Sequence, residues 1–179
     1  MYLKYTLFIS TLSYFLFTSC NNDDDNKSNN KQIQNIEFSG PVYGCADFNI
    51  QKESDSTNSR IALRINGSPY QDLGLDSTFQ SFSLPNPDLD VKILEWDGLV
   101  GEQFCNDVIV NEPPILNSLS AVSGTIQLKI SDLDTSDVFD TYKISVILEN
   151  IILNDSTESE QVTISELILE DVFVGWLPG

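Results

Sequence analysis

Residues 122–131 read VSGTIQLKIS, and this stretch indicates the fold class most clearly. Apolar or small residues at the even positions alternate with polar residues at the odd positions throughout the run. The even set is Val122, Gly124, Ile126, Leu128 and Ile130, and the odd set is Ser123, Thr125, Gln127, Lys129 and Ser131. Because successive side chains of a strand point to opposite faces, this period of two predicts a half-buried β-strand.

The same alternation recurs on both sides of that stretch. The inward rows that it predicts are Ile61, Leu63 and Ile65 upstream, and Tyr142, Ile144, Val146 and Leu148 downstream. Near the C-terminal end, Val162 and Ile164 share one parity, whereas Leu167 and Leu169 share the other. A β-bulge near Ser165–Glu166 would restore a single inward face, because one extra residue shifts the parity.

Further strands are expected between the turn-forming residues of the chain. Asn66-Gly67, Asp97-Gly98 and Pro113-Pro114 are examples of those breakers. The expected strands are 35–40, 43–50, 78–84, 89–96 and 103–110. No segment after residue 33 has the apolar period of a helix. We therefore predict an all-β fold, a single antiparallel β-sandwich of about 8–9 strands over residues 33–179, with a closed β-barrel as the alternative.

The N-terminal residues 1–19 have the features of an export signal. Lys4 supplies a positive charge, and residues 7–17 supply a short apolar region. That region is too short and too interrupted by Ser and Thr to serve as a permanent membrane span. Residues 20–32 are nearly all Asn, Asp, Ser and Lys after the first cysteine. Because such a segment buries too little apolar area to fold, we expect a disordered acidic tether spanning about 20 Å.

The tether begins at a cysteine with a distinctive setting. Leu16-Phe17-Thr18-Ser19-Cys20 resembles the cleavage box of bacterial lipoproteins, in which the cysteine is acylated and becomes the new N-terminus. The resemblance implies lipid attachment at Cys20 and stable membrane anchoring, since several acyl chains act together. The next residues, Asp23, Asp24 and Asp25, resemble the acidic export tag of Bacteroidota surface lipoproteins. This implies an outer-membrane protein that faces the cell exterior, with a periplasm-facing protein as the alternative.

Four stretches of the remaining chain are similar to small lipoproteins of marine and gut Bacteroidota. They are GCADFNIQK at 44–52, FCNDV at 104–108, TYKISVILENI at 141–151 and VGWLPG at 174–179. The resemblance covers most of the mature chain, and its motifs are structural ones. It implies a single lipid-anchored β domain, and it implies no substrate.

The charge balance excludes several classes of function. The chain carries 9 Lys and Arg residues against 27 Asp and Glu, a net charge of −18, and it has no histidine. Such a surface repels phosphate backbones, so we expect no nucleic-acid partner. Without histidine, Ser-His-Asp and Cys-His nucleophile systems are impossible. Paired carboxylates for glycoside hydrolysis are unspecific among so many acidic residues, so a small glycan-active enzyme is the least favoured interpretation.

Two cysteines remain once Cys20 is set aside. An exported chain folds in an oxidising compartment, where Cys45 and Cys105, both in expected strands, could join sheet to sheet. Closing this loop of 60 residues would stabilise the fold by about 4 kcal/mol in the chain-entropy model. The alternative is two separately buried thiols that behave as small apolar groups. We predict the disulfide.

An acidic cluster is the weak candidate for a metal site. Asp132, Asp134, Asp137 and Asp140 fall within nine residues of one another in the segment SDLDTSDVFD. Calcium prefers six to eight oxygen ligands, which such a cluster could contribute to. The spacing lacks the glycine of the helix-loop-helix calcium pattern, so an acidic loop between two strands is the favoured interpretation. We expect no cofactor and no resident metal.

Two further patterns concern carbohydrates. Trp96, Trp176, Tyr43 and Tyr70 could present flat rings to a sugar, although both tryptophans follow apolar runs that favour packing. The chain also has Asp-Ser-Thr triplets around Ser56, Ser77 and Ser156, all in expected turns. The triplets resemble the O-glycan acceptor motif of exported Bacteroidota proteins, and the resemblance implies O-glycosylation at those serines.

These observations together predict a lipid-anchored, exported β-sandwich without catalytic residues. It would act as a binding or accessory module, with a glycan or an envelope protein as its partner. The alternative is a structural or assembly partner in a larger envelope complex, which would need an exposed apolar patch or an open strand edge.

Overall fold

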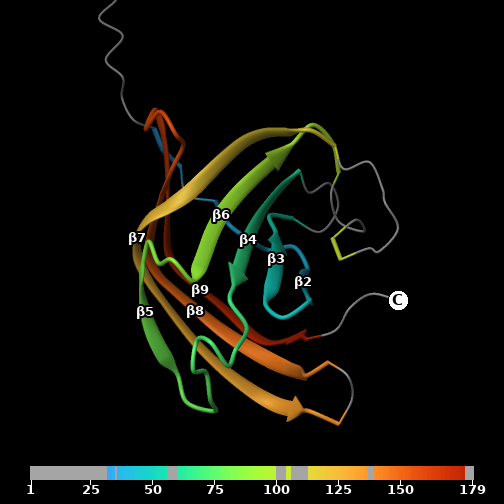
Figure 1. Ribbon diagram of the computed structural model, residues 1–179. Helices are drawn as coiled ribbons and strands as arrows, with labels where there is room; N and C mark the ends of the chain where they lie inside the picture. Colours follow the sequence, from blue (N-terminus) through green and yellow to red (C-terminus); the bar gives the residue numbers. More distant parts are fainter. Residues whose placement is uncertain are drawn as a thin grey trace, which may run out of the picture.

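The computed structural model of the chain describes residues 32–34, 36–55, 60–99, 104–105, 113–136 and 139–175 (Figure 1). Within these ranges every regular element is a β-strand. The strands are β1 (Gln32–Gln34), β2 (Val42–Cys45), β3 (Asn49–Glu53), β4 (Ile61–Gly67), β5 (Gln80–Leu84), β6 (Leu89–Trp96), β7 (Ile115–Asp134), β8 (Thr141–Asn154) and β9 (Glu160–Val174). Among the described residues, no helix has the length and apolar character needed to cross a bilayer.

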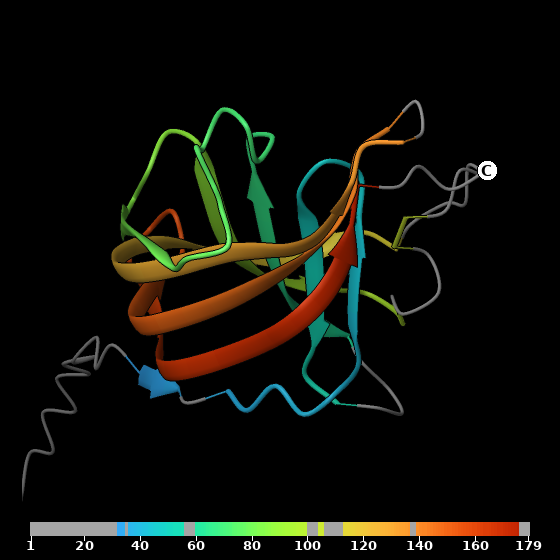
Figure 2. The ribbon, with the colours of Figure 1, turned by 90° about the horizontal axis from the view of Figure 1, so that it is seen from below.

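The strands form one sheet in the order β1-β9-β8-β7-β6-β4-β3-β2, with β5 paired to β7 beside this path. The short β1 runs parallel to β9, and the other pairings are antiparallel. The sheet curls so strongly that its two halves face each other across a common core (Figures 1 and 2). The predicted all-β antiparallel fold is confirmed. Its sandwich-like faces belong to one curled open sheet, which has the shape of a half-barrel.

The long strand β7 belongs to both halves of the sheet. Its first part pairs with β6, from Trp96↔Ile115 to Lys92↔Ser120. Its second part pairs with β5, from Leu84↔Gly124 to Gln80↔Leu128. The register with β8 shifts twice between Ala121 and Thr125, where the strand bends. The bend explains why Val122 is 44% exposed, although simple alternation predicted that it would point inward.

Glycine is required at the centre of this bend. Gly124 has a φ of +125°, a region that side chains with a Cβ rarely adopt. A Cβ at this position would lie 2.5 Å from Cδ1 of Ile151 and 2.8 Å from its Cα. The strands therefore approach closely at Gly124, which lets β7 and β8 turn the corner together.

The bend continues through β8 and β9. In β8 the buried positions change parity on either side of Asn150, from Leu148 to Ile151. In β9 they change parity between Ile164 and Leu169, yet the register with β8 continues unbroken across residues 164–167. Both strands turn together, so no extra residue is needed there. The bulge predicted near Ser165–Glu166 is therefore wrong.

The β9 bulge lies further along the strand. Ile144 pairs with Val172, but Val146 pairs with Leu169, so β9 holds one extra residue opposite Ser145. Asp171 adopts a φ of +51° at this point. As in other bulges, the extra residue changes the direction of its neighbours' side chains. Residues 170 and 171 are both exposed as a result.

Two other expected strands differ from the structure. The stretch 43–50 is a hairpin, because residues 46–48 form a turn with Ala46 at a φ of +48°. Residues 36–39 form no strand, although β1 begins at Gln32, one residue before the expected start of the domain. Of the expected strand 103–110, the structure describes only residues 104 and 105, which lie in a turn.

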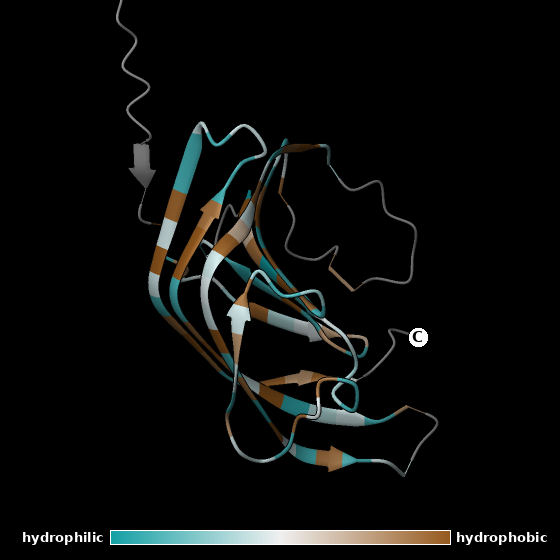
Figure 3. Ribbon diagram, turned by 60° about the vertical axis from the view of Figure 1, so that its left-hand side comes forward, coloured by the Kyte–Doolittle hydropathy of each residue, from teal (hydrophilic) through white to brown (hydrophobic). Residues whose placement is uncertain are grey.

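The core lies between the facing halves of the sheet and is almost entirely aliphatic. Figure 3 shows the expected banding, with apolar and polar residues alternating along the long strands. The predicted inward row Tyr142, Ile144, Val146 and Leu148 is confirmed, since each is at most 1% exposed. Leu63 and Ile65 are fully buried as predicted, and Ile61 packs at the margin of the core. Burial of each such side chain stabilises the fold by about 1.5–3 kcal/mol.

Candidate binding groove between strands β2 and β9

The curl of the sheet brings β2, the last strand of its path, against the C-terminal half of β9. The backbone amide of Gly175 donates a hydrogen bond to the carbonyl oxygen of Ala46 at 2.6 Å. Gly44 allows the close approach, because a Cβ there would collide with the carbonyl oxygen of Phe173. It would also lie 2.8 Å from the Cγ1 atoms of Val172 and Val174. The two strands thus form a seam that is tightest around Gly44.

A groove of about 460 Å³ runs along this seam. Its size is in the range of small-ligand sites, which is about 300–1,000 Å³. The groove is lined by Val42, Tyr43, Gly44, Phe104, Cys105, Glu170, Asp171, Val172 and Phe173. Three parts of the chain therefore contribute to it, namely β2, the bulged part of β9 and the turn that contains Cys105.

Aromatic rings and carboxylates lie close together in this groove. Tyr43 on β2 is 37% exposed, and Phe173 on β9 is 50% exposed. Glu170 and Asp171 are exposed at the bulge, where the backbone amide of Asp171 donates to Oγ of Ser145 at 3.3 Å. Of these residues, the sequence pattern had indicated Tyr43 alone. For the other groove residues, the sequence offers one indication, which is that the adjacent acidic residues Glu170 and Asp171 interrupt the alternation of β9.

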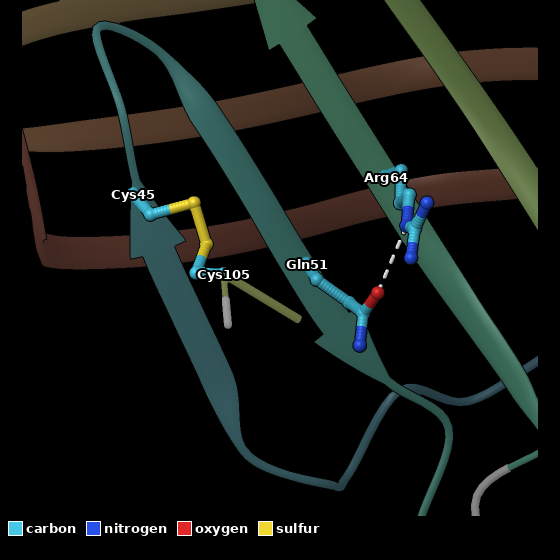
Figure 4. The surroundings of a disulfide bond; sticks show 4 residues. All are labelled: Cys45, Gln51, Arg64 and Cys105. Atoms are coloured by element: carbon cyan, nitrogen blue, oxygen red, sulfur yellow. Dashed lines mark hydrogen bonds between the residues drawn. A yellow bond between two sulfur atoms is a disulfide. The ribbon is translucent and has the colours of Figure 1, made fainter. Parts of the chain in front are cut away.

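Cys105, which lines the groove, belongs to the disulfide drawn in Figure 4. Cys45 and Cys105 are bonded, with their Cα atoms 6.0 Å apart. Cys105 lies in a turn of the connection between β6 and β7. The bond therefore joins the end of β2 to that connection, whereas a bond from sheet to sheet was expected. It also holds the neighbouring Phe104 beside β2.

Arg64 makes a second cluster on the outer face of β3, β4 and β6. Its Nε donates a hydrogen bond to Oε1 of Gln51 at 2.9 Å (Figure 4). Its guanidinium carbon lies 4.9 Å from the ring centre of Trp96 and 5.4 Å from that of Phe104. Trp96 is fully buried and so presents no ring to a ligand. Trp176, the other tryptophan considered as a sugar platform, lies outside the described residues.

Three buried polar atoms on this outer face have no hydrogen-bond partner among the described residues. They are Nε2 of Gln51, Oε1 of Glu53 and Nε1 of Trp96. Glu53 is 5% exposed, and its pKa is raised by burial and, secondarily, by the charge of Asp55. Unpaired buried atoms of this kind are rare in folded proteins. The hydrogen bonding of buried polar groups is therefore much less complete on this outer face than in the core.

The aspartates of the acidic loop between β7 and β8 interact with different partners. Asp132 pairs with Lys143 at 2.7 Å, and Asp134 accepts a hydrogen bond from the backbone amide of Ser136 at 2.9 Å. Asp137 lies outside the described residues. Within the described part of the chain, no three acidic or cysteine residues are grouped to hold a metal ion.

The fourth aspartate of this cluster, Asp140, holds a different part of the fold. Its Oδ2 accepts hydrogen bonds from the hydroxyl of Tyr70 at 2.9 Å and from Nε2 of Gln71 at 2.8 Å. Tyr70 packs edge-on against Tyr142, with ring centres 5.0 Å apart. The hydroxyl of Tyr142 donates to the carbonyl oxygen of Asp47. Burial raises the pKa of both tyrosines, so both remain neutral donors. Tyr70 and Asp140 thus fasten the loop after β4 to the β7–β8 hairpin.

Two of the Asp-Ser-Thr triplets lie in the described residues, and both are built into turns. Asp76 accepts hydrogen bonds from the amide and hydroxyl of Thr78 at 2.7 and 2.6 Å, which lower the pKa of Asp76. Asp155 is likewise bonded by Thr157 and Ser159, and its pKa is also lowered. In these two triplets the aspartate and threonine close the turn, as such residues commonly do. The central serines, Ser77 and Ser156, are exposed, and Ser56 lies outside the described residues.

The remaining predicted residues, Cys20, Asp23, Asp24 and Asp25, also lie outside the described residues. Comparison of the chain with protein-family models, curated proteins and solved structures found no match. We therefore base the proposed function on the groove, the disulfide and the charge of the chain.

Proposed function

We propose that this chain is an exported lipoprotein, anchored through Cys20, that acts as a non-catalytic binding or accessory module at the outer membrane. Its folded domain would face the cell exterior. The observation that carries the proposal is the bond between Cys45 and Cys105. Structural disulfides persist in oxidising compartments, so this bond supports export, which the sequence of residues 1–25 independently predicts.

The position of the tether supports a binding role for the groove. Gln32 pairs with Glu160 at the start of β9, whereas Glu170 and Phe173 line the groove near the end of that strand. About ten residues of strand separate these two places, a path of about 30 Å. A lipid attached at Cys20 would therefore hold the groove at the end of the domain that lies away from the tether.

An assembly role is the second candidate, and a different observation favours it. Ile115, Leu116 and Val122 of β7 are 52%, 60% and 44% exposed. Leu116 and Val122 line a shallow groove of about 560 Å³ beside Asn154 and Ser156. A contiguous exposed apolar patch is typical of protein–protein contacts, and Leu116 and Val122 line the same groove. An envelope protein bound there would leave the groove between β2 and β9 open.

Metabolic labelling tests the anchoring. Cells that express the full chain are grown with an alkyne analogue of palmitate, and the labelled protein is compared with the Cys20→Ala variant. We expect label and detergent-phase partitioning for the wild type, and loss of both for the variant. Mass spectrometry should find an acylated Cys20 as the N-terminal residue. An unmodified thiol at Cys20, or membrane retention of Cys20→Ala, would contradict the proposal.

Exposure to the exterior is tested separately. Intact cells are treated with a protease that does not cross the outer membrane, and the chain is followed by immunoblotting. A variant with Asp23, Asp24 and Asp25 replaced by Asn keeps the tether length but removes its acidic charge. We expect digestion of the wild type and protection of the variant. Protection of both would indicate a periplasm-facing protein.

A further inference from the structure

We propose that the groove between β2 and β9 binds an extended, positively charged peptide segment that carries apolar side chains. The inference deepens the proposed binding function and rests on it. It assigns the site to the groove lined by Tyr43, Glu170, Asp171 and Phe173.

The charged side chains among the described residues that line the groove are both acidic. Glu170 and Asp171 are exposed at its rim, and Lys and Arg are absent from the described residues that line it. Three cations of the described chain lie near this lining. Lys143 pairs in register with Phe173 and is bound to Asp132 at 2.7 Å, and the charge of Asp171 also attracts it. Lys52 pairs in register with Val42 and donates a hydrogen bond to the carbonyl oxygen of Gly40. Arg64 stacks on the ring of Phe104 and donates to Gln51. Each of these cations has a partner outside the groove, so a cationic ligand would complement the two carboxylates of the lining.

The aromatic rings favour the same kind of ligand. The exposed rings of Tyr43 and Phe173 stand on the two strands that border the groove. A Lys or Arg side chain attracts the face of such a ring with its charge and packs its methylene stem against apolar surface. Val42, at 37% exposure, extends the apolar wall. A ligand that alternates basic and aliphatic residues would use the rings, the valine and the carboxylates together.

The shape of the site suits an extended chain. The groove follows two strands, and the amide of Gly175 bonds the carbonyl oxygen of Ala46 just after the stretches of β9 and β2 that line it. The bulge at Asp171 directs the two carboxylates outward beside the groove. The net charge of −18 would in addition attract a cationic segment from a distance, so binding should weaken with salt. A neutral glycan could stack on the rings but would leave both carboxylates without a counter-charge.

Calorimetric titration tests the proposal with the full chain in a non-ionic detergent. The probe is a capped hexapeptide that alternates Lys and Leu. The comparison ligands are the same hexapeptide with Glu in place of Lys, and a neutral hexasaccharide of glucose. We expect binding of the Lys-Leu peptide alone, with affinity falling about tenfold between 50 and 300 mM salt.

Matched variants on one strand locate the site. Glu170→Gln and Phe173→Ser should each weaken peptide binding about fivefold. The controls Glu166→Gln and Ile168→Ser change exposed residues of β9 outside the groove, and Ile168 is 50% exposed like Phe173. They should leave the affinity unchanged. Equal effects in variant and control, or equal binding of the Lys and Glu peptides, would overturn the proposal.

Amide NMR shifts of the unmodified protein provide a test that does not depend on the folding of a variant. Titration with the Lys-Leu peptide should shift the amides of residues 42–44 and 170–173. Shifts concentrated elsewhere would overturn the proposal, and hexasaccharide-induced shifts in those two ranges would identify a glycan site instead. Labelling at Cys20 is measured independently, so an acylated chain that fails to bind the peptide would refute this inference alone.

Discussion

The inner and outer faces of strands β3, β4 and β6 differ sharply in apolar packing and in the hydrogen bonding of their buried polar groups. The inner face contributes Ile50, Leu63, Ile65 and Ile93, which are at most 3% exposed within a continuous aliphatic core. The outer face has only a small apolar cluster of Ala62, Leu94 and Trp96. Around it lie the unpaired polar atoms of Gln51, Glu53 and Trp96. The inner face therefore sets the fold, whereas the disulfide and Arg64 hold the outer one.

Among the changes that test this contrast, removal of the disulfide should have the largest effect on the free energy of unfolding. The Cys45→Ala, Cys105→Ala double variant loses the closure of a loop with a sequence separation of 60. We expect the free energy of unfolding to fall by about 4 kcal/mol, because the unfolded chain gains conformational entropy. Urea denaturation with and without a reductant measures the change. A loss below about 1 kcal/mol would show that the outer face keeps its order without the bond.

Replacing a buried leucine by alanine on each face should give the next largest change in the free energy of unfolding. Leu63→Ala on the inner face should lower the unfolding free energy by about 4 kcal/mol at most, since its cavity lies in dense packing. Leu94→Ala, at 7% exposure on the outer face, should cost about 2 kcal/mol. Urea midpoints measure both. Equal losses would contradict the contrast, because they would show an outer face packed as well as the core.

Glu53 should make stability depend on pH. Its folded-state pKa is raised, mainly by burial, so the ionised form is disfavoured in the folded protein. The unfolded chain then binds fewer protons than the folded one above the ordinary carboxyl pKa, and stability falls as pH rises through the raised value. Glu53→Gln should remove that fall and raise the unfolding free energy at pH 7 by about 1 kcal/mol.

Thermal melts of wild type and Glu53→Gln between pH 4 and pH 8 measure this difference. Glu37→Gln is the matched control, because Glu37 is an exposed residue outside the strands. The control should retain the wild-type pH profile. Parallel profiles for wild type and Glu53→Gln would exclude Glu53 as the cause of the dependence.

Substitution of Arg64 should give the smallest change in the free energy of unfolding. Lysine in its place would keep the charge but lose the planar stacking on Trp96 and Phe104. We expect Arg64→Lys to cost about 0.5–1 kcal/mol in urea denaturation. Arg60→Lys, at an exposed position next to β4, should cost nothing measurable. Equal values for the two variants would show that stacking contributes little to the outer face.

Period-two patterning predicted the inner face from sequence, as the row from Tyr142 to Leu148 shows. It failed where the chain turns without glycine or proline. The hairpin turn at residues 46–48 contains neither, and Ala46 takes the positive φ instead. The shared corner of β8 and β9 was also missed, because the parity of one strand does not reveal a simultaneous turn in its neighbour.

The groove could not have been predicted from local sequence. Tyr43 and Phe173 are 130 positions apart and meet only because the sheet curls until β2 reaches β9. Gly44 permits that approach, but a glycine within a strand can equally mark a bulge or a tight bend. The disulfide partners were predictable because Cys45 and Cys105 are the two cysteines that remain once Cys20 is set aside, whereas the turn that holds Cys105 was not.

The parallel pairing of β1 has a mechanical consequence for an anchored protein. Only Gln32, Ile33 and Gln34 join this strand to β9, and the next backbone hydrogen bond from the described segment is donated by Ser39 to Ser54. In a chain anchored through Cys20, as proposed, drag on the domain would load the β1 bonds first. Their rupture would release the chain only as far as Ile36, because Ile36 and Phe38 pack against the core. About four residues, or roughly 13 Å of chain, would then extend while the core stayed intact. The short strand would thus yield under load before the folded domain does.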